Sequence, residues 1–212
     1  MDAAILLYHR FTALDAVGPY EVLRNIPGAT VTFVAEESGP GRADSGALAI
    51  VADKTLDEMP TADVIVVPGG PGQSDHMDDE AILGWLRTAD AASTWTTSVC
   101  TGSLLLAAAG LLEGTKATSH WLALDTLHRY GAEPTPERVG EQGKIITAAG
   151  VSSGIDMGLH LAAKIAGDDV AQAIQLGIEY DPQPPFDAGS PSKAPAQIVD
   201  FLRDQSRHVL QG

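Results

Sequence analysis

Short apolar runs alternate along this chain with segments in which apolar residues recur at the spacing of an α-helix. The apolar and β-branched runs predict strands, which fall at residues 3–8, 29–36, 47–52, 63–67, 94–99 and 144–147. The helical spacing predicts helices, at residues 79–92, 104–109, 121–130, 153–166, 168–180 and 197–210. One further helix is expected to open at Gly18-Pro19, because proline fits the first turn of a helix.

This alternation predicts an α/β fold built on a doubly wound, mostly parallel sheet. The run at residues 64–67 is apolar throughout, as expected of a central strand that helices cover on both faces. Ligands of such folds bind beyond the carboxyl ends of the strands. Two candidate segments follow predicted strands, the Gly69-Gly70 turn and Cys100, so the functional site is expected at this edge.

Cys100 is the only cysteine, and it lies between a predicted strand and a predicted helix. A nucleophile at such a sharp strand-to-helix turn occupies a nucleophile elbow, which pushes the side chain outward. The partial positive charge of the helix N-terminus favours thiolate over thiol, so a reactive cysteine with a depressed pKa is expected. The alternative is that Cys100 is a small buried apolar residue, as free cysteines often are.

Two further segments are candidates for the same site. The backbone N–H groups of Thr101 and of Gly69-Gly70 would form an anion hole for charge that develops during nucleophilic attack. An ordinary glycine turn is the alternative. Asp15 would be the acid–base partner of the thiol, or else the N-cap of the helix that follows it. Glu21 is a rival carboxylate, but its place inside that helix indicates a solvated residue.

Other catalytic and binding sites have weaker support. His120 lies beside Trp121 at a predicted helix start and would act as a Cys–His base or simply pack there. The remaining histidines lack ligand spacing, so no metal site is predicted. The glycine run that begins at Gly69 lacks the Lys-Ser/Thr of a P-loop and the full dinucleotide fingerprint, so no nucleotide site is predicted either.

Composition narrows the classes of partner. The 212 residues suit a single domain over residues 1–212, and acidic residues outnumber Lys and Arg by 28 to 13, giving a net charge of −15. Without a basic cluster, neither nucleic acid nor an anionic membrane is an expected partner. A lone cysteine fits a reducing cytoplasm. No apolar stretch approaches the ~18 residues of a membrane span.

Residues 181–195 form the one long irregular segment, with five prolines. A loop of this length in a compact domain is usually functional or disordered. Its prolines reduce the entropy lost on ordering, and its aromatic Phe186 needs a partner surface. We expect an ordered loop that helps form the pocket wall or a dimer contact, with a solvated linker as the alternative.

Three motifs together resemble the ThiJ/PfpI superfamily, whose members are cysteine-dependent and related to class I glutamine amidotransferases. They are Val66-Val67-Pro68-Gly69-Gly70, Ser98-Val99-Cys100-Thr101-Gly102 and Ala117-Thr118-Ser119-His120-Trp121. The resemblance spans nearly the whole chain. Most members carry a glutamate where this chain has Asp15. That aspartate, with the late block that begins Glu179-Tyr180-Asp181-Pro182, resembles the isocyanide hydratase branch.

The resemblance implies a flavodoxin-like fold, a homodimer and no cofactor. It implies a hydro-lyase that converts a small-molecule isocyanide and water to an N-substituted formamide through a covalent cysteine thioimidate. Cys100 would be the nucleophile and Asp15 the acid–base group, while the N–H groups of Thr101 and Gly70 would hold developing charge or water. Two alternatives stay open: a glyoxalase or deglycase of the same superfamily, and a non-enzymatic redox sensor or regulatory domain of the kind found in AraC-type transcription factors.

Overall fold

A seven-stranded sheet forms the centre of the molecule in the computed structural model, which describes residues 1–207. All neighbouring strands are parallel except the edge pair of β10 and β11. The predicted mostly parallel sheet is therefore confirmed. The strand order is β10 (Val139–Gln142), β11 (Ile145–Ala148), β7 (Trp95–Val99), β6 (Val64–Val67), β1 (Asp2–Leu6), β2 (Thr30–Ala35) and β5 (Lys54–Thr55).

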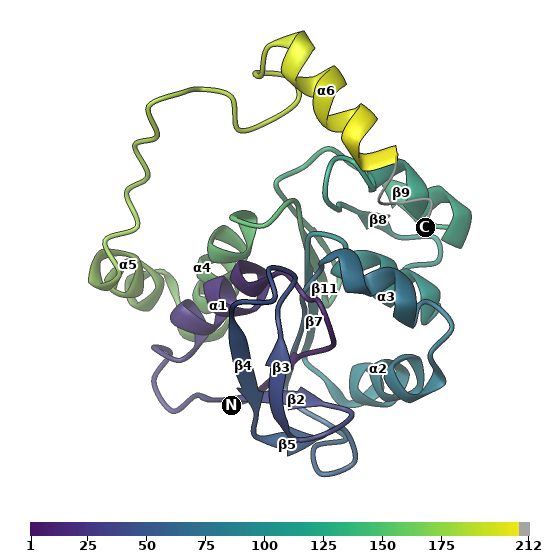
Figure 1. The fold of residues 1–212 in the computed structure, drawn as a ribbon. Helices are drawn as coiled ribbons and strands as arrows, with labels where there is room; N and C mark the ends of the chain where they lie inside the picture. Colours follow the sequence, from purple (N-terminus) through teal and green to yellow (C-terminus); the bar gives the residue numbers. More distant parts are fainter. Residues whose placement is uncertain (208–212) are drawn as a thin grey trace.

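Helices cover both faces of this sheet (Figure 1). One face carries α1 (Ala13–Leu23), α4 (Ser153–Ala166) and α5 (Asp168–Gly177), and the other carries α2 (Glu80–Ala92) and α3 (Gly102–Ala108). Strand β6 is buried along its whole length because it lies between the two layers. This arrangement is the doubly wound, flavodoxin-like fold that the alternation and the resemblance predicted.

Several short elements were not predicted. The expected strand at residues 47–52 lies outside the main sheet, where β4 (Ala49–Ala52) pairs antiparallel with β3 (Gly39–Arg42). The expected helix at residues 121–130 is a 3₁₀ helix, η2 (Leu124–Tyr130), and another, η1 (Pro71–His76), follows β6. A two-stranded parallel pair, β8 (Lys116–Ala117) and β9 (Glu133–Pro134), completes the fold.

The start of α1 differs from the sequence prediction. The helix begins at Ala13 rather than at Gly18-Pro19, and Pro19 lies inside it. Proline removes one helical hydrogen bond, yet its ring packs on α4, where a Cβ atom added to Gly154 would lie 3.1 Å from Pro19 Cδ. Packing between α1 and α4 thus outweighs the local preference. The earlier start places Asp15 in the first turn of the helix.

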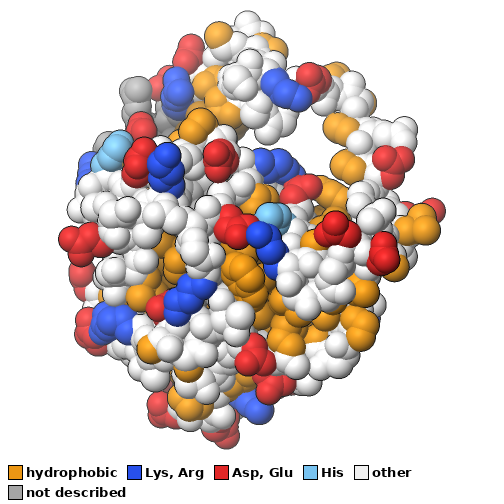
Figure 2. Space-filling view, turned by 180° about the vertical axis from the view of Figure 1, so that it is seen from behind, with side chains coloured by type: hydrophobic (Ala, Val, Ile, Leu, Met, Phe, Trp, Pro, Cys, Tyr) orange, Lys and Arg blue, Asp and Glu red, His pale blue; other side chains and the backbone are white. Residues whose placement is uncertain are grey.

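The C-terminal part of the described chain forms an arm. Residues 178–195 leave α5, which ends at Gly177 rather than at residue 180, and lead to α6 (Ala196–Arg207). Figure 2 shows that this arm stands away from the body and frames an opening. Helix α6 returns to the body, where the Arg203 guanidinium lies 5.7 Å from the centre of the Trp121 ring. The last predicted residues of this helix, 208–210, lie outside the described residues.

The middle of the loop is exposed, and Phe186 has 77% of its surface accessible to solvent. The expectation that residues 181–195 form a pocket wall or a dimer contact therefore stays a prediction. No helix within residues 1–207 combines the length and the apolar character needed to cross a membrane.

The packing of α1 on α4 gives a stability prediction. A Cβ atom added to Gly158 in α4 would lie 2.9 Å from Val22 Cβ in α1, so Gly158→Ala should lower the free energy of unfolding by about 1–3 kcal/mol in urea denaturation. Gly177→Ala is the matched control, because nothing lies within 4 Å of its added Cβ. Equal stability of the two variants would contradict the close packing of the two helices.

Candidate active site

Cys100 lies at a sharp turn between β7 and α3, at the carboxyl edge of the sheet. Its φ of 58° places a non-glycine residue in the left-handed region, which costs about 1–3 kcal/mol and persists only where the surroundings hold it. The Cys100 N–H donates to the carbonyl oxygens of Ala148 and Ala149, at 3.0 and 2.9 Å. This backbone is that of the predicted nucleophile elbow, although the side chain is buried, with 6% exposed.

Two glycines allow the elbow to pack closely against the turn that follows β6. A Cβ atom at Gly102 would lie 2.0 Å from the carbonyl oxygen of Val67. A Cβ atom at Gly69 would lie 2.4 Å from the backbone nitrogen of Thr101. The predicted meeting of the Gly69-Gly70 turn with Cys100 and Thr101 therefore takes place, and it depends on the absence of side chains.

Asp15 enters the same site from the first turn of α1, with none of its surface exposed. Its Oδ2 accepts a hydrogen bond from the Gly69 N–H at 2.9 Å. Its Oδ1 is buried and accepts no hydrogen bond of ordinary geometry, while hydrogen bonding between the thiol and the carboxyl group shifts the pKa of both. The alternative role as an N-cap is wrong, since Thr12 holds that position.

Burial governs the protonation of this pair. It raises the pKa of Asp15 to about 7, although the hydrogen bonds from Gly69 and Cys100 oppose the rise. Burial first, and then the charge of Asp15, raise the pKa of Cys100 to about 12. The expectation of a depressed thiol pKa is therefore wrong for this pair. Desolvation and the neighbouring carboxylate outweigh the favourable backbone N–H groups.

Two backbone N–H groups hydrogen-bond the sulfur, those of Thr101 and Val151, and both lower the thiol pKa. The Gly70 N–H, expected to line the same hole, instead donates to Thr101 Oγ1 at 3.0 Å. Gly70 therefore holds the Thr101 side chain rather than the sulfur. Sequence reasoning missed Val151, although its position between strand β11 and helix α4 repeats the strand-to-helix pattern of Cys100.

His120 packs near the site without bonding the sulfur. Its Nδ1 accepts the Leu122 N–H at 3.3 Å, and its ring lies over Gly150, where an added Cβ would be 2.8 Å from His120 Cδ2. Burial lowers the pKa of His120, which favours the neutral ring. The rival carboxylate Glu21 is half-buried and pairs with Arg24 at 2.8 Å. The site thus brings together Cys100, Asp15 and Thr101.

One group within residues 1–207 has metal-ligand geometry, the side chains of Glu36, His76 and Asp79, whose ligand atoms lie within 4.8 Å of one another. The spacing of these residues in the sequence did not indicate it. His76 Nδ1 lies 2.7 Å from Asp79 Oδ2, and Asp79 also accepts the Ala81 N–H as the N-cap of α2. These local contacts explain the positions of His76 and Asp79 without a metal ion.

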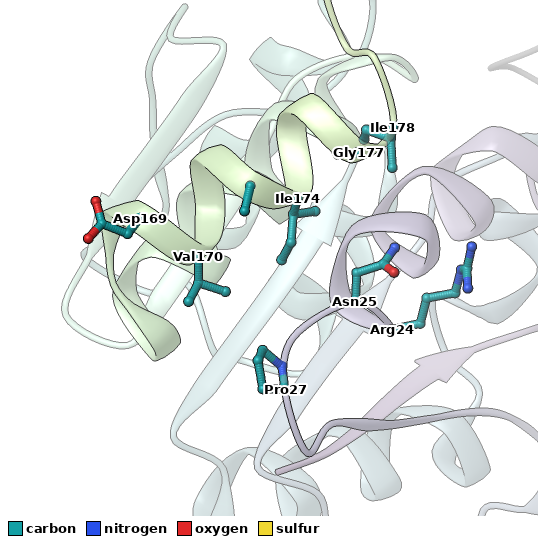
Figure 3. A pocket seen from close by; sticks show the side chains of 9 residues that line it. Arg24, Asn25, Pro27, Asp169, Val170, Ile174, Gly177 and Ile178 are labelled. Atoms are coloured by element: carbon teal, nitrogen blue, oxygen red, sulfur yellow. The ribbon is translucent and has the colours of Figure 1, made fainter.

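A groove of about 510 Å³ lies between the end of α1 and α5 (Figure 3). Arg24 and Asn25 line it from one side and Ile174 from the other. Neither Cys100 nor Asp15 lines this groove. The buried thiol–carboxyl pair is therefore a separate site at the carboxyl edge of the sheet.

The chain matches a known protein family over most of its length. Residues 1–164 match the DJ-1/PfpI family. The chain belongs to the DJ-1/PfpI family. It is 42% identical over 211 residues to the isonitrile hydratase of Pseudomonas putida, and the alignment covers 100% of this chain and 92% of that protein. The ThiJ/PfpI resemblance seen in the sequence motifs is thereby confirmed.

Two further proteins are similar to this DJ-1/PfpI chain. A crystal structure of a ThiJ/PfpI family protein from Pseudomonas syringae superposes with a TM-score of 0.95 at 39% identity, over 99% of this chain and 87% of that one. The HTH-type transcriptional regulator CdhR of Pseudomonas aeruginosa is 32% identical over 137 residues, which are 64% of this chain and 40% of the regulator. The family therefore includes both an enzyme and a regulator among the relatives of this chain.

The raised pKa of Asp15 predicts a pH-dependent stability. Between about pH 4 and pH 7 the unfolded chain has lost this proton while the folded chain retains it, so the free energy of unfolding should fall as the pH rises through this window. The loss attributable to Asp15 should be at most about 4 kcal/mol. Urea denaturation at both pH values should show a smaller loss in Asp15→Asn, and parallel profiles for the two proteins would contradict the assignment.

Proposed function

We propose that this protein is an isocyanide (isonitrile) hydratase that converts R–N≡C and water to the N-substituted formamide R–NH–CHO. The buried pair of Cys100 and Asp15 carries the proposal, because it places a soft nucleophile beside a carboxyl group whose pKa is about 7. A group that titrates near neutral pH serves as acid in one step and as base in the next. The 42% identity to an isonitrile hydratase over the full chain supports the same activity.

The first step forms a covalent thioimidate. Asp15 first takes the proton of the Cys100 thiol, and the sulfur then attacks, as thiolate, the electrophilic terminal carbon of the isocyanide. The carbon–sulfur bond forms, and the same carbon takes the proton from Asp15. The product is R–N=CH–S–Cys100 with Asp15 as the carboxylate. One proton has moved, and nothing has been oxidised or reduced.

The second step consumes water. Asp15 takes one proton from water as the oxygen attacks the thioimidate carbon, and it passes that proton to the substrate nitrogen. The tetrahedral intermediate R–NH–CH(OH)–S–Cys100 then collapses to the formamide as the carbon–sulfur bond breaks. The sulfur leaves as the thiolate, and Asp15 takes the hydroxyl proton and passes it to the sulfur. The starting state is restored, and the net change is the addition of one water.

Backbone groups support both steps. The N–H groups of Thr101 and Val151 hydrogen-bond the sulfur, so they stabilise the negative charge that it carries before attack and as a leaving group. Gly69 fixes one carboxylate oxygen of Asp15 and leaves Oδ1 for proton transfer. Gly70 contributes by holding the Thr101 hydroxyl.

The mechanism predicts which variants lose activity. Cys100→Ala should abolish formamide production from a simple alkyl or aryl isocyanide, because the chain has no second thiol. Asp15→Asn should lower kcat at least about a hundredfold, since the amide retains the hydrogen bonds but transfers no proton. Glu21→Gln is the matched control and should retain wild-type activity, because Glu21 pairs with Arg24 and contacts neither Cys100 nor Asp15. Formamide production by Cys100→Ala at the wild-type rate would overturn the covalent mechanism.

Turnover of methylglyoxal distinguishes an isocyanide hydratase from a glyoxalase or deglycase of the same superfamily. The wild-type protein should hydrate the isocyanide much faster than it converts methylglyoxal, the substrate expected of a glyoxalase or deglycase. Faster turnover of methylglyoxal would favour that alternative. No turnover of either compound by the folded, reduced protein would favour a regulatory or redox-sensing domain.

We also propose that the enzyme works as a cytoplasmic homodimer without a cofactor. The apolar side chains of Ile198, Phe201 and Leu202 on α6 are exposed in one chain, as is Phe186 on the loop. Apolar surface of this kind is buried when a partner subunit covers it. Light scattering at micromolar concentration should give twice the 22.1 kDa mass of one chain, and a monomeric mass would contradict the proposal.

A further inference from the structure

Val151 supplies one of the two N–H groups at the sulfur from a strained backbone. Its φ is 27°, in the left-handed region that β-branched residues rarely adopt. Such strain persists only where neighbouring contacts hold the backbone in place. The contacts that hold Val151 therefore decide whether its N–H reaches the Cys100 sulfur.

Arg138 contacts the chain on both sides of Val151. Its carbonyl oxygen accepts the Ala149 N–H at 2.9 Å, two residues before Val151. Its guanidinium donates to Ser152 Oγ, just before α4, at 3.3 Å. It also donates to Asp156 Oδ2, in the first turn of α4, at 2.7 Å. One residue thus fixes the end of β11 and the start of α4 relative to each other.

Tyr180, three residues after the end of α5, completes this group. Its hydroxyl lies 3.2 Å from both carboxylate oxygens of Asp156. The Asp156 carboxylate therefore binds the Arg138 guanidinium and the Tyr180 hydroxyl together. Tyr180 lies within the late block that the sequence comparison with the isocyanide hydratase branch singled out, yet no step of the mechanism uses it.

We propose that Arg138, Asp156 and Tyr180 form a positioning network that holds the Val151 N–H on the Cys100 sulfur. The network does not contact the reacting atoms, and it acts through the backbone at residues 149–152. An exposed ion pair alone would contribute little to stability, and the side chains of Arg138 and Asp156 are 50% and 32% exposed. The pair of Arg138 and Asp156 instead orients the strained backbone at Val151. This inference rests on the proposed site but not on the identity of the substrate.

Alkylation of Cys100 tests the network directly. Iodoacetamide reacts with the thiolate, and the only cysteine of the chain is Cys100, so the rate at a fixed pH reports this sulfur alone. Tyr180→Phe removes the hydrogen bond to Asp156 without changing any charge. We expect alkylation at pH 8 to slow about threefold to tenfold, because loss of an N–H bond to the thiolate raises the thiol pKa. Tyr130→Phe, in η2, is the control and should alkylate at the wild-type rate.

The sign of the change separates positioning from simple destabilisation. A merely structural role would loosen the site, expose the buried sulfur and speed alkylation, and this outcome or an unchanged rate would overturn the proposal. Arg138→Gln should slow alkylation like Tyr180→Phe, whereas Arg87→Gln, which breaks a surface pair with Glu80, should not. Circular dichroism of each variant confirms that it is folded. Because alkylation needs no substrate, failure of the proposed hydratase activity leaves this test intact.

Discussion

The burial of a carboxyl group against a sulfur atom sets the character of this molecule. Asp15 and Cys100 are both withdrawn from water, so a second negative charge on the pair is strongly disfavoured. Above about pH 7 the pair therefore keeps a single proton, and the position of that proton determines whether the sulfur or the carboxylate is the anion. Gly69 fixes the carboxylate, and two strand-to-helix turns direct N–H groups at the sulfur.

Much of the fold could be predicted because its signals are local. The apolar run of β6 and the alternation of strands and helices predicted the parallel sheet. The lone cysteine, between a strand pattern and a helix pattern, predicted the sharp turn at Cys100. The start of α1 could not be predicted in this way. The local sequence predicts Pro19 in the first turn of the helix. Its place inside the helix depends on packing against Gly154, which is distant in the sequence.

The site was likewise predicted only in part. Asp15, Cys100 and Thr101 could be found from turn patterns and motifs, whereas the partners of individual N–H groups could not. The Gly70 N–H faces Thr101 Oγ1, and Val151 takes the place expected for it at the sulfur. The thiol pKa was predicted in the wrong direction, because a helix terminus is visible in a sequence while the depth of burial is not.

The solitary state of Cys100 has a consequence for damage and recovery. Oxidation of a thiolate to a sulfenic acid is reversible when a second thiol condenses with it to form a disulfide. This chain contains no second cysteine, and Cys100 is buried, with only 6% of its surface exposed. Reduction of a sulfenic acid formed here therefore requires a thiol from another molecule, which must reach a buried residue. The burial that slows oxidation of Cys100 thus also slows its repair.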